Sequence, residues 1–315
     1  MVLEAESARH TGPAPVPRLT PAVLRPLRGI HPLRSCRMVA LEWVTILGAA
    51  ALSEWFRHPL SYVLTIVWIG SRQHALFLLA HEGAHGLLHP DRRWNERISE
   101  LFCAWPVLIP FRSYRSIHRL HHRHLNSERD PDWARNRPDR LRNSRGPLDS
   151  LSVLLGLDGG QSKLLVFFIV GDSDGLRRLI YYSVALAVIG LSNGLPLLVY
   201  YWLIPLFTWF IASMRLKGTA EHLALPEGAS SRTLLPRRLE ALLIAPNNVG
   251  YHAAHHAYPN VPFYNLPELH RKLMELDAFR EAAHVTHGYL AFLGEWFSSG
   301  SSPTPRMPRS DLQRA

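Results

Sequence analysis

Long apolar runs, arranged in two pairs, constrain this chain more than any other feature. The first pair is Val39–Trp55 and Pro59–Ala80, and the second is Leu179–Leu191 and Pro196–Leu216. A helix that crosses the hydrocarbon of a bilayer needs about 20 residues, a length that only the fourth run meets comfortably. The runs predict two membrane hairpins. The alternative is a soluble all-α protein in which the same runs are core helices.

The distribution of charge favours the membrane. The net charge is +10, and two hairpins would place both termini and residues 81–178 on one side, together with nearly all the arginines. The opposite loops, around Arg57 and Asn193, would be small. Cytosolic segments carry such an excess of positive charge, so we expect both termini and the histidine-rich segments in the cytosol, with a bacterial inner membrane as the location. Zinc-finger spacing and basic patches interleaved with aromatic residues are absent from the sequence, which argues against nucleic-acid binding.

The two ends of the chain differ from the part between them. Residues 1–38 are rich in proline and arginine and lack an apolar period, and residues 298–315 are of low complexity. We expect a disordered basic N-terminal tail at 1–38, a membrane domain at 39–297 and a flexible C-terminal tail at 298–315. The only two cysteines, Cys36 and Cys103, are too few for a disulfide framework or a cysteine metal site.

The chain has 18 histidines, and eight of them fall into three clusters, HEGAH, HRLHH and HAAHH. On a helix, residues spaced i, i+3 and i+4 converge on one face. Eight imidazoles are too many for one tetrahedral metal and suit two metals better. Imidazole suits iron, zinc, copper or nickel, so these ligands alone do not choose the metal. The eight candidate ligands are His81, His85, His118, His121, His122, His252, His255 and His256.

The clusters and their flanking phrases, such as HEGAHGLLHPDRRWN and NNVGYHAAHHAYPN, resemble those of the membrane fatty acid desaturase superfamily. That superfamily includes acyl desaturases, related hydroxylases and carotenoid ketolases, and the resemblance covers about residues 40–275. It implies an all-α fold, an integral membrane four-helix transmembrane bundle with a cytosolic helical cap that holds a histidine-rich di-metal site. It also implies two Fe2+ ions as cofactors, O2 as co-substrate, and His222 as a further metal ligand.

Three other polar positions bear on the implied site. Some members of the superfamily carry an asparagine one turn before the histidine that matches His222, whereas this chain has Gly218 there, and Asn248 is a candidate replacement. The carboxylates of Asp130 and Asp132 follow the second cluster. We expect these carboxylates either to accept hydrogen bonds from imidazole N–H groups, and so orient the rings, or to form a structural turn.

The resemblance implies a membrane-bound, O2-dependent oxidoreductase, and the first expectation is a fatty acyl lipid desaturase that introduces a C=C bond. The alternatives are a hydroxylase or ketolase of a lipid, alkane or carotenoid and, from another class, a non-catalytic membrane metal-binding protein. The sequence has no dinucleotide-binding fingerprint, no cysteines for an iron–sulfur cluster and no fused cytochrome b5 signature. We therefore expect an external ferredoxin or cytochrome-type electron donor. An apolar substrate tunnel is expected along Leu76, Leu79, Trp209, Phe210 and Met214, and His284 and His287 are expected at the surface.

Overall fold

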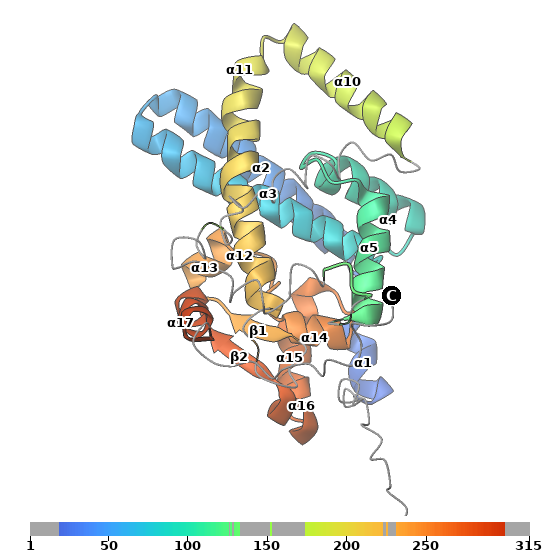
Figure 1. Cartoon of the computed structure of the whole chain (residues 1–315). Coiled ribbons are helices and arrows are strands. Elements are labelled where there is room, and N and C mark those ends of the chain that lie inside the picture. The colour runs from blue at the N-terminus through green and yellow to red at the C-terminus, as the bar shows by residue number, and fades with distance from the viewer. Residues whose placement is uncertain are drawn as a thin grey trace, which may run out of the picture.

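The computed structural model describes residues 19–125, 127, 129–132, 152, 174–222, 225 and 231–299. These residues form helices and one small sheet (Figure 1). The N-terminal half contains α1 (Pro21–Leu27), α2 (Pro32–Phe56), α3 (Pro59–Ala84), α4 (Arg92–Ile98), the π-helix η1 (Ser99–Ala104) and α5 (Phe111–His124). Next come α10 (Gly175–Leu191), α11 (Leu195–Leu198), the π-helices η2 (Val199–Leu203) and η3 (Leu206–Phe210), and α12 (Ile211–His222).

The C-terminal part packs short elements beneath the long helices (Figure 1). They are β1 (Arg232–Leu235), α13 (Arg238–Leu243), α14 (His252–Ala257), η4 (Phe263–Asn265), α15 (Leu266–Met274), α16 (Asp277–Ala282), β2 (His284–His287) and α17 (Tyr289–Ser299). The strands β1 and β2 pair in parallel, with Arg232 opposite His284. β1 also contacts α12 and α14, so this sheet joins two of the segments that carry histidines.

Within the part of the chain that the structure describes, three helices are long and apolar enough to cross a membrane: α2, α3 and the continuous helical stretch Leu195–His222. Proline occupies the first turn of both α2 and α3, where its missing N–H costs no hydrogen bond. α2 and α3 form an antiparallel hairpin, and the Leu195–His222 stretch crosses it (Figure 1). The remaining expected run forms α10, which at 17 residues is shorter than these three.

The expectation of a disordered N-terminal tail is wrong for residues 19–38, the part of this segment that the structure describes. α1 and the first turns of α2 lie between residues 21 and 38. Leu24 and Leu27 are buried, and the Tyr264 hydroxyl donates to the Gly29 carbonyl over 3.0 Å. Contacts with the distant α15 region, rather than a local apolar period, order this segment. Residues 1–18 and the chain beyond 299 lie outside the described residues.

Two charged side chains inside the apolar helices pair with each other. Arg72 Nη1 of α3 lies 3.2 Å from Glu42 Oε2 of α2, and both side chains are buried. Arg72 also donates to the Leu242 carbonyl at the end of α13. Unpaired charges are costly at membrane depth, and this pairing explains how both residues are accommodated in otherwise apolar helices.

The crossing of α3 with η3 depends on a glycine. A Cβ placed on Gly70 would lie 2.7 Å from Trp209 Cβ and 2.9 Å from the Phe210 nitrogen. The two backbones therefore meet at a distance that only glycine allows. This crossing fixes the direction of α12, whose last residue is His222.

Candidate metal centre

The histidine clusters sit on helix ends that meet at one place. His81 is in the last turn of α3, and His85 caps that helix. The second cluster occupies the end of α5, the third cluster forms α14, and His222 ends α12. The structure thus brings together all nine residues predicted from sequence, and it arranges their rings in two groups.

The first histidine group contains five rings from all three clusters. Its shortest separations join Nε2 atoms: 2.8 Å between His85 and His118, and 3.0 Å between His81 and His255. His122 Nε2 lies 3.0 Å from that of His118 and 3.2 Å from that of His255. The members of this group are His81, His85, His118, His122 and His255.

The second histidine group contains four rings. His252 Nε2 is 2.9 Å from both His222 Nε2 and His256 Nε2. His121 completes the group, and the ligand atoms of all four rings lie within 4.8 Å of one another. His122 and His256 stack across the boundary between the groups with ring centroids 4.4 Å apart, so the two groups are adjacent.

Helical geometry explains how the clusters are divided. Neighbouring residues on an α-helix point about 100° apart, whereas residues i and i+4 share a face. In both H-x-x-H-H clusters the first and fifth positions therefore enter one group, and the fourth position enters the other. The second cluster contributes His118 and His122 to the first group and His121 to the second. The third cluster does the reverse, with His252 and His256 in the second group and His255 in the first.

The donor set fits metal ions. Two imidazoles that bind one ion at about 2.1 Å and at right angles would have nitrogens about 3.0 Å apart, close to the separations in both groups. Hydrogen bonds between the rings explain the arrangement less well, because His118, His252 and His255 each direct one Nε2 at two other Nε2 atoms. A neutral imidazole carries a single N–H. Convergent lone pairs are the arrangement that a metal ion requires.

Burial favours the neutral form of most of these rings. It lowers the pKa of His85 to about 3, helped by the charges of His122 and Arg119 nearby. It lowers the pKa of His122 to about 4, with a further contribution from His121. Burial among other imidazoles also holds the pKa well below its ordinary value at His118, His252, His255 and His256. Neutral rings with available lone pairs are the form of histidine that binds metals.

Several Nδ1 atoms have partners that orient the rings. His121 Nδ1 lies 2.9 Å from Asp130 Oδ1, as expected of a carboxylate that orients this ring, and the Asp132 N–H also donates to Asp130 Oδ1 over 2.9 Å, as expected of a turn. Asp132 is farther away, with Oδ2 3.8 Å from the same nitrogen. Sequence reasoning missed two partners: the Tyr114 hydroxyl, 2.9 Å from His81 Nδ1, and Glu221 Oε1, 3.4 Å from His252 Nδ1. Tyr114 stands one helical turn before His118, a spacing that could have identified it.

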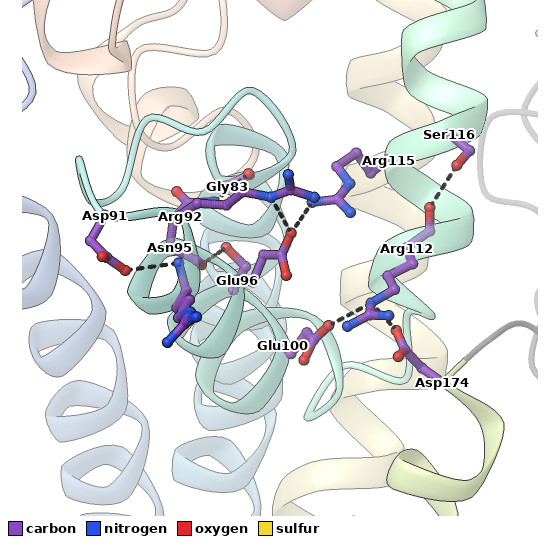
Figure 2. A network of polar contacts seen from close by, with 12 residues as sticks. Gly83, Asp91, Arg92, Asn95, Glu96, Glu100, Arg112, Arg115, Ser116 and Asp174 are labelled. Atoms are coloured by element: carbon purple, nitrogen blue, oxygen red, sulfur yellow. Dashed lines mark hydrogen bonds and ion pairs between the residues drawn. The ribbon is translucent and has the colours of Figure 1, made fainter.

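A polar network holds the helix of the second cluster in place (Figure 2). Glu96 of α4 pairs with Arg115 of α5 over 2.9 Å, and Glu100 of η1 pairs with Arg112 over 3.3 Å. Arg112 also pairs with Asp174 at the start of α10. Asn95 Nδ2 donates to the Gly83 carbonyl over 2.8 Å, inside the first cluster. The network therefore ties α5 to the segment that follows α3.

A narrow cavity reaches histidines of both groups. It touches His81 and His255 of the first group and His252 of the second. Its other lining residues are Leu78, Glu82, Asn247, Val249, Phe263 and Leu266. None of the five residues expected to form a tunnel lines this cavity. Leu76 and Leu79 are fully buried in the core on another face of α3, whereas Leu78 shares a helical face with His81 and Glu82.

Two further residues make contacts that the sequence did not predict. The Asn248 side-chain nitrogen donates to the Phe263 carbonyl over 3.2 Å. Phe263 N–H in turn donates to Glu82 Oε2 over 3.0 Å, which anchors the segment after α14 to the end of α3. His284 is only half-buried but is not isolated at the surface: its Nε2 lies 2.9 Å from Glu295 Oε2.

Comparison with known proteins agrees with this site. The family described as fatty acid desaturase matches residues 53–288. A dihydrorhizobitoxine desaturase of Bradyrhizobium elkanii is 26% identical over 73% of this chain and 71% of its own length. A beta-carotene ketolase of Paracoccus sp. is 27% identical over 67% of this chain and 79% of its own length. A chloroplastic sn-2 acyl-lipid omega-3 desaturase (ferredoxin) of Arabidopsis thaliana is 24% identical over 74% of this chain and 58% of its own length.

The family match contains all three histidine clusters and His222, the residues that the fold gathers into two adjacent groups. The named relatives are desaturases and a ketolase, which are oxidoreductases, and the apolar helices suit membrane association. The chain belongs to the fatty acid desaturase family.

Proposed function

We propose that this chain is a membrane-bound, O2-dependent di-iron oxidoreductase, and that it introduces a C=C bond into a fatty acyl lipid. The single observation that carries the proposal is the division of nine imidazoles into two adjacent groups, with a cavity that touches both. We assign the five rings of the first group to one iron and the four rings of the second group to the other. Two irons held there supply the reactivity with O2 that breaking an unactivated C–H bond demands, since no side-chain acid or base removes such a hydrogen.

The side chains around the cavity would position the substrate. Leu78, Val249 and Phe263 offer apolar surface to the methylenes of an acyl chain and exclude water from the reacting carbons. The backbone link between Phe263 and Glu82 keeps this wall against the end of α3. The residues of this chain thus bind and align the substrate beside the histidine groups.

The membrane would surround a belt of exposed apolar side chains. Large exposed residues recur along α2 from Leu41 to Phe56, at the start of α3, along α10 and at 195–200. At 1.5 Å per residue, the α2 part of the belt is about 22 Å long, which suits the interior of a bilayer. We assign α10 as the fourth membrane helix on this basis, because lipid explains why most of its leucines, isoleucines and valines are exposed.

The histidine groups would then lie on the cytosolic side, in a helical cap. Arg72 and Glu42 mark the level at which α3 becomes buried in protein, and His81 follows Arg72 by nine residues, or about 14 Å along the helix. We place both termini and all three clusters in the cytosol of a bacterial inner membrane. A Cys36→Ser, Cys103→Ser background tests this, with single cysteines at Ser192 and Arg119. We expect these to react from opposite sides, and reaction from the same side would contradict the topology.

An external protein would supply electrons. Arg119 and Arg123 are exposed on a face of α5 beside its cluster histidines, and they provide positive charge near the site for an acidic donor. Two relatives carry the word ferredoxin in their names. We therefore propose a ferredoxin or cytochrome-type donor that docks on this face. Arg119→Glu should raise the KM for the donor and leave the KM for the lipid unchanged.

Desaturation and oxygen insertion differ in product mass. We propose desaturation of a lipid or acyl chain as the first candidate. The second candidate is hydroxylase or ketolase chemistry on a lipid, alkane or carotenoid, which the similarity to a ketolase favours. Mass spectrometry of membranes from an expressing host separates the two. Loss of a pair of hydrogens supports the desaturase, and gain of an oxygen atom supports the alternative. Unchanged lipids, with iron bound and an electron donor present, would favour a non-catalytic metal-binding protein.

A further inference from the structure

The two histidine groups differ in the side chains that contact the Nδ1 atoms of their rings. In the second group, His121 Nδ1 lies 2.9 Å and 3.1 Å from the two carboxylate oxygens of Asp130. The Asp130 side chain is completely buried, so water does not compete for this contact. A carboxylate therefore fixes the tautomer of His121 and leaves its Nε2 lone pair directed at the group.

A second carboxylate approaches the same group from α12. Glu221 Oε1 lies 3.4 Å from His252 Nδ1, and both side chains are 5% exposed. The other oxygen of Glu221 lies 2.8 Å from Lys217 Nζ, one helical turn earlier. Lys217 thereby restrains the carboxylate at the position from which it faces His252. Glu221 also precedes His222, so one turn of α12 brings both a ring and a carboxylate to the second group.

The first group lacks this support in the part of the chain that the structure describes. Its one oriented Nδ1 belongs to His81 and lies 2.9 Å from the Tyr114 hydroxyl, a neutral partner. None of the described carboxylates pairs with a ring of this group. The Glu82 carboxylate is next to His81 in sequence but accepts from the Phe263 N–H instead.

A carboxylate and a phenol have different effects on a ligand ring. A charge-assisted hydrogen bond is about twice as strong as a neutral one, and it makes the opposite ring nitrogen a better electron donor. Loss of such a partner behind a metal-binding histidine costs about 10-fold to 100-fold in metal affinity. The second group has one carboxylate hydrogen-bonded to His121 and a second carboxylate 3.4 Å from His252 Nδ1, whereas the first group has one phenol on one of its five rings.

We propose that Asp130 and Glu221 are positioning residues for the second metal alone, so that the two metal sites of this chain are unequal and separately adjustable. The inference rests on the proposed two-metal function. Removal of either carboxylate weakens the metal of the second group and leaves that of the first group in place. Asp130 has the larger effect, because its contact with the ring is shorter and involves both oxygens.

The test is an anaerobic Fe2+ titration of the full-length protein in detergent against a competing chelator, with iron counted per chain and the bound iron examined by Mössbauer spectroscopy. His222→Ala and His85→Ala assign the spectral signals of the second and first group. The test variants are Asp130→Asn and Glu221→Gln, with Lys217→Met as a variant that releases Glu221 without altering it. Glu268→Gln is the matched control, because it makes the same change in an exposed ion pair of α15.

We expect Asp130→Asn to lower the affinity for one iron by about 10-fold to 100-fold, and Glu221→Gln by less. The weakened signal should be the one that His222→Ala removes, and Lys217→Met should act in the same direction. Tyr114→Phe should weaken the other signal only, and Glu268→Gln should change nothing. If both carboxylate variants bound two irons with wild-type affinity, the inference would be overturned but the proposed function would stand. A wild-type protein that binds no iron would overturn the proposed function and the inference with it.

Discussion

The two halves of α3 place similar residues in opposite environments. Near its start, Leu60, Val63 and Leu64 are more than half exposed, whereas Leu76 and Leu79 near its end are fully buried. The first half presents apolar side chains outward because lipid is its solvent in our account, and the second half is enclosed by protein because it carries His81. An exposed side chain in this molecule therefore faces either lipid or water. Substitutions that distinguish the lipid-facing, water-facing and buried positions test the account.

The largest effect, a loss of turnover, is expected at the histidines on the buried half of α3 and on the helices that meet it. We predict that His118→Ala and His252→Ala, one from each group, abolish turnover while the protein remains in the membrane. Each removes one of few convergent donors, whereas the helices and their apolar contacts hold the fold. Product formation by the purified variant, with an electron donor supplied, measures the effect. His287→Ala, at an exposed position on β2, should retain wild-type activity. Substantial turnover in both cluster variants would contradict the role given to the groups.

The next effect concerns the boundary between the two halves, where Arg72 pairs with Glu42. Arg72→Met leaves the Glu42 carboxylate buried without its partner, and we predict a loss of about 3–5 kcal/mol in the free energy of unfolding. The double change Arg72→Met with Glu42→Gln should recover most of that loss. Reversible unfolding in mixed micelles measures both. Equal stability of the single and double variants would show that the ion pair is not what stabilises this boundary.

A smaller effect separates exposure to lipid from exposure to water. Leu47 on α2 and Leu120 on α5 are both exposed, at 63% and 43%. Leu47→Asp would place a charge in the membrane belt and should cost about 3 kcal/mol on an insertion scale. Leu120→Asp faces water in our account and should change stability by less than about 0.5 kcal/mol. A membrane-insertion assay together with thermal unfolding compares them. Similar behaviour of the two variants would argue against the assigned belt.

The smallest of these effects is expected where α3 crosses η3. Gly70→Ala puts a Cβ against Trp209 and the Phe210 backbone, and overpacking of this kind costs about 1–3 kcal/mol. Gly48→Ala on α2 is the matched control, because a Cβ there meets nothing within 4 Å. The difference in unfolding midpoint between the two variants is the measured quantity. If Gly70→Ala were as stable as Gly48→Ala, the close crossing would not exist in solution.

The clustering of eight histidines and the apolar helices follow from local patterns in the sequence, whereas His222 followed from the resemblance to the family. That these nine histidines bind metal stays a prediction. The sequence did not predict how the histidines divide, since that depends on where α5, α12 and α14 meet. Adjacent residues such as His121 and His122 enter different groups, a result of the helical angle between them that a motif does not display. Glu221 was missed for the same reason, because its partner His252 lies on another helix, whereas the spacing of Tyr114 before His118 could have identified that residue.

The order of residues 21–38 was missed for a related reason. The proline-rich and arginine-rich composition of this segment is typical of a disordered tail. Its structure comes instead from burial of Leu24 and Leu27 in the core, and from hydrogen bonds that the Leu27 and Gly29 carbonyls accept from residues more than 200 positions away. Composition does not report such contacts, so this boundary could not be placed from the sequence alone.

The iron content of the protein, purified anaerobically in detergent and compared with that of two cluster variants, tests the central claim most directly. The account predicts about two irons per chain in the wild type, because the nine rings form two convergent groups. It predicts loss of one iron in His85→Ala and of the other in His222→Ala, distinguished by their Mössbauer signals. A wild-type chain that binds no iron, or binds it equally well in both variants, would contradict the claim that these histidines hold two metals.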